Sequence, residues 1–170
     1  MKAPIVSTHA RWLRVVLTLT VAASIQATAA RADSVFWTDW LSGTPGASGE
    51  ATGTLNVNGT PVTVSYSGEV AFIQTGQPGE TNYWNPSSPY ISPTVPNAPP
   101  GTDIIGLSMA TSKTITFSEA ITNPLFAVVS LNGNGYSFDR DFEILSYGQG
   151  YWGNGTLTKT NPSAGIYQLN

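Results

Sequence analysis

Asn58-Gly59 is the feature that most restricts what this chain can fold into. It separates two segments, 51–57 and 60–66, in which apolar and polar residues alternate. A two-residue β-hairpin turn needs positive φ at both central positions, which Asn and Gly tolerate, so this pattern is typical of an antiparallel hairpin. Four residues of the hairpin are expected to pack: Val57, Val62, Val64 and Tyr66.

Further short segments are predicted to be strands, and Gly and Asn residues separate them. They are 35–41, 69–75, 103–109, 113–118, 125–131, 136–146 and 151–159, and 166–169 looks like the opening of another. We predict an all-β fold, a two-sheet antiparallel β-sandwich of jelly-roll-like type, in a single domain over residues 33–170. A last strand without a partner would leave an exposed edge. Either that edge is protected or the sequence stops short of the complete sandwich, and we expect the second.

Residues 76–102 differ from the rest, because they contain seven prolines and no apolar periodicity. Proline lacks the N–H that a strand ladder uses, so we expect one long loop here. Loops of this length in a compact domain are usually functional or disordered. Tyr83, Trp84 and Tyr90 lie within the loop, and disordered segments hold few large aromatic residues.

The N-terminal segment, residues 1–32, has the pattern of a secretory signal peptide. A basic start precedes an apolar run at 15–25, and Ala30-Arg31-Ala32 offers a cleavage site before Asp33, with 27–29 as a second option. The run is shorter than the roughly 20 apolar residues that span a bilayer. We expect an exported protein, extracellular or at the cell surface, with no stable membrane span in the mature chain. A membrane anchor is the alternative.

Removal of this segment reduces the kinds of catalytic and binding site that the protein can form. The single histidine, His9, leaves with it, and the chain has no cysteine. A Ser-His-Asp triad, a cysteine nucleophile and a zinc site of His and Cys are therefore excluded. Three basic residues remain against all ten acidic ones, which gives a net charge of −7. Three scattered cations cannot form a nucleic-acid interface, so we expect no nucleic-acid partner.

Segment 138–144 carries the sharpest local pattern of charge. A strand here would place Phe138, Arg140, Phe142 and Ile144 on one face. It would place Asp139, Asp141 and Glu143 on the other. These carboxylates could hold a structural Ca²⁺ ion, which takes oxygen ligands. They could supply a catalytic pair for glycoside hydrolysis. They could also form a solvated face that protects a sheet edge, which is the interpretation we favour.

Aromatic residues form a second group of interest. Five of them are our candidate ligand-binding residues: Tyr83, Trp84, Tyr90, Tyr151 and Trp152. Exposed rings flanked by Asn and Gln could stack on sugars, and exposed aromatic patches often mark interaction sites. Alternatively, the rings pack the long loop onto the sandwich, since large rings dominate core packing.

The order of several short motifs resembles exported bacterial proteins of the PEP-CTERM type, which exosortase systems sort to the envelope. The motifs are Trp37-Thr38-Asp39-Trp40, residues 62–68, residues 114–118 with Asn123-Pro124, Phe142-Glu143-Ile144-Leu145-Ser146 and Gly150-Tyr151-Trp152-Gly153. The resemblance covers most of residues 35–160. It implies a secreted β-sandwich of the cell surface or exopolysaccharide matrix, and not an enzyme. The family's C-terminal sorting tag, a Pro-Glu-Pro motif with a membrane helix and basic tail, is not among these 170 residues.

The leading hypothesis is therefore a non-enzymatic secreted or surface protein, a matrix or exopolysaccharide-associated component that binds glycan. Its partner would be a polysaccharide or another surface molecule, and structural Ca²⁺ is the one cofactor considered. A secreted glycan-cleaving enzyme is the alternative, with a carboxylate pair drawn from Asp103, Asp139, Asp141 and Glu143. A third hypothesis is a self-assembling surface subunit that pairs edge strands.

Overall fold

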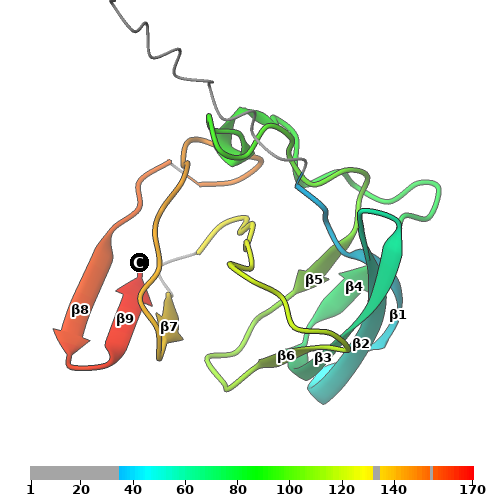
Figure 1. The fold of residues 1–170 in the computed structure, drawn as a ribbon, viewed down its shortest axis with the longest axis horizontal. Helices are drawn as coiled ribbons and strands as arrows, with labels where there is room; N and C mark the ends of the chain where they lie inside the picture. Colours follow the sequence, from blue (N-terminus) through cyan, green and yellow to red (C-terminus); the bar gives the residue numbers. More distant parts are fainter. Residues whose placement is uncertain (1–34, 132–134, 154) are drawn as a thin grey trace, which may run out of the picture. The chain divides into compact units, whose positions relative to one another are not determined.

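The computed structural model describes residues 35–131, 135–153 and 155–170. All of them belong to one compact unit, Arg31–Asn170. They form β-strands joined by loops, with one short 3-10 helix, so the all-β class is confirmed (Figure 1). The predicted signal peptide lies outside the described residues. Within the part of the chain that is described, no helix has the length and apolar character needed to cross a membrane.

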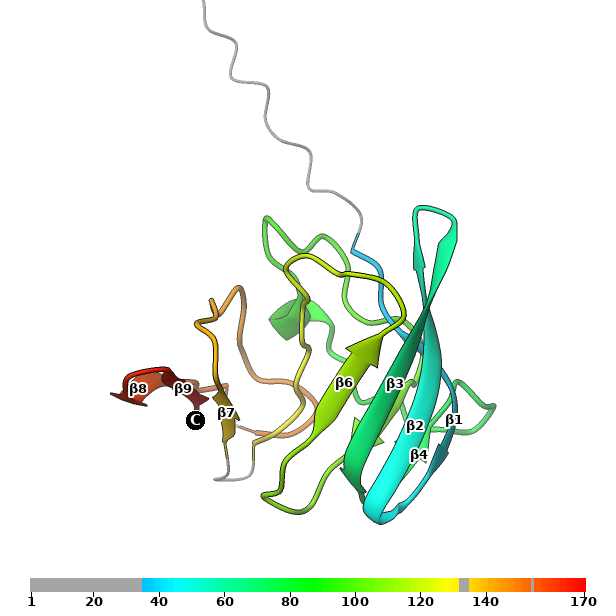
Figure 2. The ribbon, with the colours of Figure 1, turned by 60° about the horizontal axis from the view of Figure 1, so that its bottom comes forward.

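The largest sheet has four antiparallel strands in the order β1-β2-β3-β6 (Figure 2). Strand β1 spans Asp39–Thr44, β2 spans Gly46–Val57, β3 spans Thr60–Val70 and β6 spans Thr114–Phe117. The long hairpin of β2 and β3 forms the centre of this sheet, with β1 and β6 at its two edges.

The hairpin predicted around Asn58-Gly59 is confirmed. Asn58 has φ 52° and Gly59 has φ 89°, as the tight turn requires. The Gly59 N–H donates a hydrogen bond to Oδ1 of Asn56 at 2.8 Å, which stabilises the turn. Along β3 buried and exposed residues alternate as far as Tyr66. Of the four residues expected to pack, Val62, Val64 and Tyr66 are buried and Val57 is partly buried.

Two clusters of buried side chains lie on the inner face of this sheet. They are Ala51 with Tyr66 and Val70, and Leu55 with Val62 and Val64. Trp40 packs against both clusters. A β-carbon at Gly53 would lie 2.6 Å from the Asp39 carbonyl oxygen and 3.0 Å from the Trp40 ring. A glycine there therefore lets the Trp40 ring lie close to β2. Burial of a large apolar side chain contributes about 1.5–3 kcal/mol to stability.

A two-stranded sheet follows, in which β4 (Phe72–Gln74) pairs with β5 (Ile104–Gly106). The single strand predicted over 69–75 is therefore wrong. Its first two residues end β3, and the chain bends at Ala71, whose N–H donates to the Gly106 carbonyl at 2.8 Å. The bend turns β4 away from β3 and onto β5.

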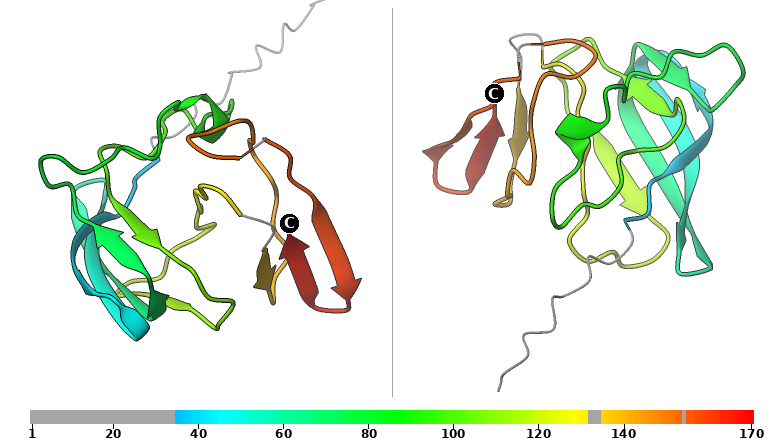
Figure 3. Two further views of the ribbon diagram at one scale, coloured as in Figure 1. Left: turned by 180° about the vertical axis from the view of Figure 1, so that it is seen from behind. Right: turned by 90° about the horizontal axis from the view of Figure 1, so that it is seen from above.

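The third sheet contains three short strands in the order β7-β9-β8 (Figure 3). They are β7 (Tyr136–Phe138), β8 (Lys159–Ser163) and β9 (Ile166–Leu169). The segment that looked like an opening strand, 166–169, is the central strand of this sheet. Strand β8 contains Pro162, which an edge strand tolerates because its outer N–H groups need no partner in the sheet.

Three predicted strands in the C-terminal part are wrong in whole or in part. Residues 125–131 lie outside the strands, and β7 ends at Phe138 and does not continue to Ser146. In the segment predicted as 151–159, only Lys159 is in a strand, as the first residue of β8. No described residue after Gly106 is buried. The apolar alternation in these segments therefore does not mark a buried face, and the two-sheet sandwich stays a prediction.

The proline-rich segment 76–102 contains only the 3-10 helix η1 (Ser88–Tyr90) and an isolated bridge between Ser92 and Val95. Its contacts fasten it to the segment that precedes β1. The Asn97 side chain accepts a hydrogen bond from the Val35 N–H at 3.3 Å and donates one to the Val35 carbonyl at 3.0 Å. The segment thus provides a stable surface that can position side chains.

Candidate functional site

Tyr83, Tyr151 and Trp152 form an aromatic cluster, although Tyr83 is far from the other two in the sequence. The ring centroids of Tyr83 and Trp152 are 4.7 Å apart, and their planes are inclined by 31°. Tyr151 lies nearly perpendicular to both partners, 5.1 Å from Tyr83 and 4.8 Å from Trp152. These distances are those of attractive aromatic pairs. The structure therefore brings together three of the five candidate ligand-binding residues.

The cluster is open to solvent on one side. Tyr151 is 45% exposed and Trp152 is 50% exposed, whereas Tyr83 is partly buried and also contacts the Phe72 ring at 6.1 Å. Phe72 was not singled out from the sequence, since it lies in a segment predicted to be an ordinary strand. Large rings with half their surface in water are a feature of interaction sites.

Close packing of glycines holds the segment before Tyr151 against the proline-rich loop. A β-carbon at Gly150 would lie 3.0 Å from the Tyr90 hydroxyl oxygen, and one at Gly148 would lie 3.6 Å from the Pro89 side chain. The glycine-rich sequence 148–150 thus allows the two segments to meet. This contact positions Tyr151 and Trp152 beside Tyr83.

The packing interpretation applies instead to Trp84 and Tyr90, whose rings are both buried. Trp84 is 7% exposed and Tyr90 is 8% exposed, and their rings meet edge to face at 5.3 Å. The Trp84 indole Nε1–H donates a hydrogen bond to the Asp103 carbonyl at 3.0 Å. Burial raises the pKa of the Tyr90 hydroxyl. Neither ring offers a free face for a ligand, and the Trp84 hydrogen bond fastens the loop to the residue before β5.

The alternating faces predicted for residues 138–144 are wrong, because β7 ends at Phe138 and the following residues leave the sheet. The structure therefore does not align Asp139, Asp141 and Glu143 along one strand face. Arg140, which the alternation placed among apolar residues, is exposed. Within the described ranges, no group of three or more His, Cys, Asp or Glu residues could hold a metal ion. The proposed Ca²⁺ site has no geometric support.

Asp141 is engaged with Lys159 instead. The Lys159 ammonium donates to the Asp141 carboxylate and to the Phe142 carbonyl, and it lies 5.0 Å from the centre of the Phe142 ring. The hydrogen bond from Lys159 is the main cause that holds the pKa of Asp141 below its ordinary value. Asp141 also accepts the Phe142 N–H at 2.8 Å. Its negative charge is therefore compensated within the protein.

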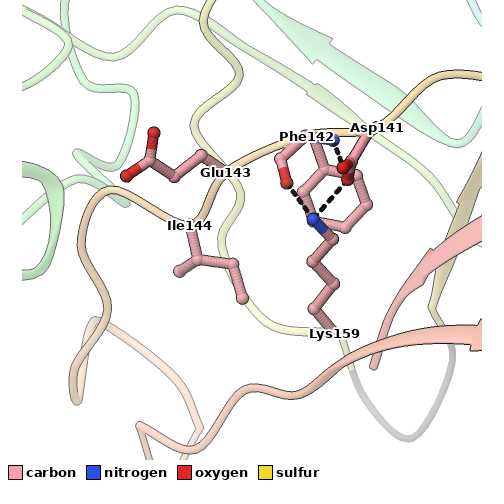
Figure 4. Close-up of a pocket in the computed structure, with 5 residues that line it drawn as sticks. All are labelled: Asp141, Phe142, Glu143, Ile144 and Lys159. Carbon is pink, nitrogen blue, oxygen red and sulfur yellow. Dashed lines mark hydrogen bonds and ion pairs between the residues drawn. The ribbon is translucent and has the colours of Figure 1, made fainter.

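These groups line a shallow, open depression formed by Asp141, Phe142, Glu143, Ile144 and Lys159 (Figure 4). Figure 4 shows the Glu143 carboxylate directed away from the ion pair of Asp141 and Lys159. The depression therefore does not present two carboxylates directed at one point, as glycoside hydrolysis requires.

Asp103, the other carboxylate considered for catalysis, belongs to a different group of residues. Its Oδ1 accepts the Trp40 N–H at 3.2 Å. Burial is the main cause that raises the pKa of Asp103, and the negative charges of Asp39 and Glu80 raise it further. The residues that influence Asp103 in the described structure thus do not include the 139–143 segment.

Glu69 is the buried polar residue that sequence reasoning missed. Its side chain is 2% exposed, and its carboxylate accepts hydrogen bonds from Ser108 and Met109. The alternation of β3 continues through Val70, which is buried with Tyr66, so Glu69 belongs to the other face of the strand. It is buried there by the segment after β5, whose Ser108 and Met109 donate to its carboxylate.

Comparison with protein-family models, with curated proteins and with solved structures finds no match to this chain. A functional assignment therefore rests on the residues of the chain and on their geometry.

Proposed function

We propose that this chain is an exported, non-enzymatic β-sandwich protein of the bacterial cell surface or extracellular matrix, and that it binds glycan. The signal-peptide pattern of residues 1–32 and the resemblance to PEP-CTERM-type proteins support the location. The aromatic cluster of Tyr83, Tyr151 and Trp152 carries the proposed activity. Polysaccharide would be the partner.

The cluster supports glycan binding because it combines exposure with a fixed arrangement. Tyr151 and Trp152 keep about half of their surfaces in solvent, and each ring contacts the other two members of the cluster. Aromatic side chains have few rotatable bonds, so they offer a large contact area at a small loss of conformational entropy. Rings already held by their neighbours lose even less upon binding.

A two-layer arrangement of the sheets is part of the proposal. Tyr136, in β7, has its pKa raised mainly by burial and in addition by the charge of Glu69 in β3. Burial, the charge of Glu69 and the proximity of Tyr136 raise the pKa of Tyr66 to about 12. The influence of Glu69 on Tyr136 supports an arrangement in which β7 faces the large sheet.

Binding can be tested directly with the protein purified after export. The probes are microcrystalline cellulose, chitin and insoluble xylan, and the measurement is the fraction of protein that sediments with each. We expect retention on at least one probe without release of reducing ends. Absence of retention on every probe, or turnover of any of them, would contradict the proposal.

A further inference from the structure

We infer that the aromatic cluster is a stacking site for an uncharged pyranose ring with equatorial hydroxyl groups, as in a β-linked glucan. The exposed part of the Trp152 ring would take the sugar, and the exposed part of Tyr151 would contact it from beside the indole. This inference deepens the proposed glycan binding and rests on it.

Tyr83 packs against one side of the Trp152 ring and leaves much of the ring in solvent. The two rings are close to parallel, at 31° with centroids 4.7 Å apart, so Tyr83 shields the near face of the indole. Yet Trp152 keeps 50% of its surface in solvent. Half of the Trp152 surface therefore stays available to a ligand although Tyr83 packs against the ring.

Tyr151 extends the exposed aromatic surface beside Trp152. Its ring stands at 85° to the indole plane, with the centroids 4.8 Å apart, and it is 45% exposed. A ligand on the exposed part of the indole can therefore also contact Tyr151, which suits one ring of a chain and leaves the others to continue beyond it.

The face of a pyranose ring and the face of an indole are chemically complementary. A pyranose ring with equatorial hydroxyls exposes axial C–H groups on its faces, and the face of an indole carries the negative part of its quadrupole. An aromatic cage for a cation is a poor fit, because a cation must approach the faces of several rings. Here the three rings contact one another at 4.7–5.1 Å, which leaves no space between them.

The charges of the molecule favour an uncharged ligand. Lys113 donates to the Met109 and Thr111 carbonyls and pairs with Glu69 at 3.8 Å, and Lys159 pairs with Asp141. Two of the three cations that follow residue 32 are thus engaged. The ten carboxylates beyond that point give the protein an excess of negative charge, which repels a polyanionic chain.

The inference can be tested by affinity electrophoresis of the exported protein in native gels. One gel contains hydroxyethyl cellulose, which is neutral, and the other contains polygalacturonate, which is anionic. We expect retardation by the neutral glucan alone. Exposed Trp and Tyr residues are common binding hot spots, so Trp152→Ala and Tyr151→Ala should each raise Kd about tenfold or more. Trp152→Phe keeps a smaller ring, and its Kd should be intermediate.

Tyr147→Ala is the matched control, because Tyr147 is 63% exposed and lies four residues before Tyr151. Its Kd should equal that of the unaltered protein. Glucan binding that is unaffected by Trp152→Ala and Tyr151→Ala, or binding of polygalacturonate as strong as that of glucan, would overturn the inference but leave glycan binding intact. No binding to any polysaccharide, sedimentation probes included, would overturn both.

Tyr83 is a positioning residue in this arrangement, since it acts through Trp152. Tyr83→Ala should weaken glucan binding and shift the emission maximum of Trp152, whereas Tyr83→Phe should restore both because the ring remains. If Tyr83→Ala and Tyr83→Phe weaken binding equally, the supporting role of the ring is wrong.

Discussion

The carboxylate of Glu69 receives both the N–H and the hydroxyl of Ser108. The N–H lies 3.0 and 3.1 Å from the two carboxylate oxygens, and the hydroxyl lies 2.8 Å from Oε1. The Met109 N–H adds a further bond at 3.2 Å. These contacts tie the end of β3 to the segment that follows β5. A buried carboxylate surrounded by donors in this way is held in its ionised form.

Loss of the Glu69 carboxylate should destabilise the fold strongly. Glu69→Ala removes the charged acceptor that Ser108 and Met109 share and leaves a void at a buried position, which should lower the free energy of unfolding by about 2 kcal/mol. Chemical denaturation measures the change. Glu50→Ala is the matched control, since Glu50 is exposed on β2, and it should shift the free energy by less than about 0.5 kcal/mol. Equal effects of the two changes would contradict this role.

The same carboxylate should make stability depend on pH. Burial raises the pKa of Glu69, but hydrogen bonds from Ser108 and Met109 and the charge of Lys113 outweigh it, so the pKa lies below the ordinary 4.5. The folded protein therefore binds fewer protons than the unfolded chain near this pH. The stabilisation is present above the unfolded pKa and is lost as pH falls through the folded pKa.

The stability difference between the unaltered protein and Glu69→Gln should thus be constant near neutral pH and shrink below about pH 4.5. Urea denaturation at a series of pH values gives this difference. A stability difference that grows as the pH falls would show that the pKa of Glu69 is not lowered in the folded protein.

The pH dependence of stability that Asp103 causes should have the opposite sign to that of Glu69. The pKa of Asp103 is raised above the ordinary 3.8, mainly by burial. The contribution of this group to stability is therefore complete below the unfolded pKa and is lost as pH rises through the folded pKa. Asp103→Asn keeps an oxygen that can accept the Trp40 N–H and removes the charge. At pH 7 it should raise the melting temperature by about 2 °C, since partial exposure screens the effect. A lower melting temperature would contradict this expectation.

Loss of the Trp84 ring should destabilise the protein much more than loss of the Trp152 ring. Trp84→Ala removes a buried ring and its hydrogen bond to the Asp103 carbonyl, so it should cost about 3–5 kcal/mol of unfolding free energy. Trp152→Ala should change stability by less than about 1 kcal/mol, because half of this ring is already in solvent. Denaturation of both variants, followed by far-UV circular dichroism, makes the comparison. Similar losses would argue against the assignment of Trp84 to the core.

Export should remove the first 32 residues. The pattern of small residues predicts cleavage between Ala32 and Asp33. N-terminal sequencing of the protein from the periplasm or medium should therefore begin at Asp33. A protein that retains His9 would instead support the membrane-anchor alternative.

The sequence predicted the central hairpin well because Asn58-Gly59 determines its turn and one face of each strand is buried. It failed where those conditions are absent. Residues 139–146 alternate but leave the sheet, and no side chain there is buried. The burial of Glu69 depends on contacts with Ser108 and Met109, which lie 39 and 40 residues further along the chain and which spacing does not reveal. The meeting of Tyr83 with Trp152 depends on loop packing between segments that are far apart in the chain.

The two apolar clusters have a consequence for the order in which the nascent chain folds. Every residue in them, and every partly buried residue packed against them, lies between Phe36 and Ile121. A polypeptide that emerges N-terminus first therefore delivers all of these residues before β7, β8 and β9 appear. The large sheet can begin to collapse before the last strands are available, so much of the apolar surface of the nascent chain is covered early, when aggregation would otherwise be most damaging.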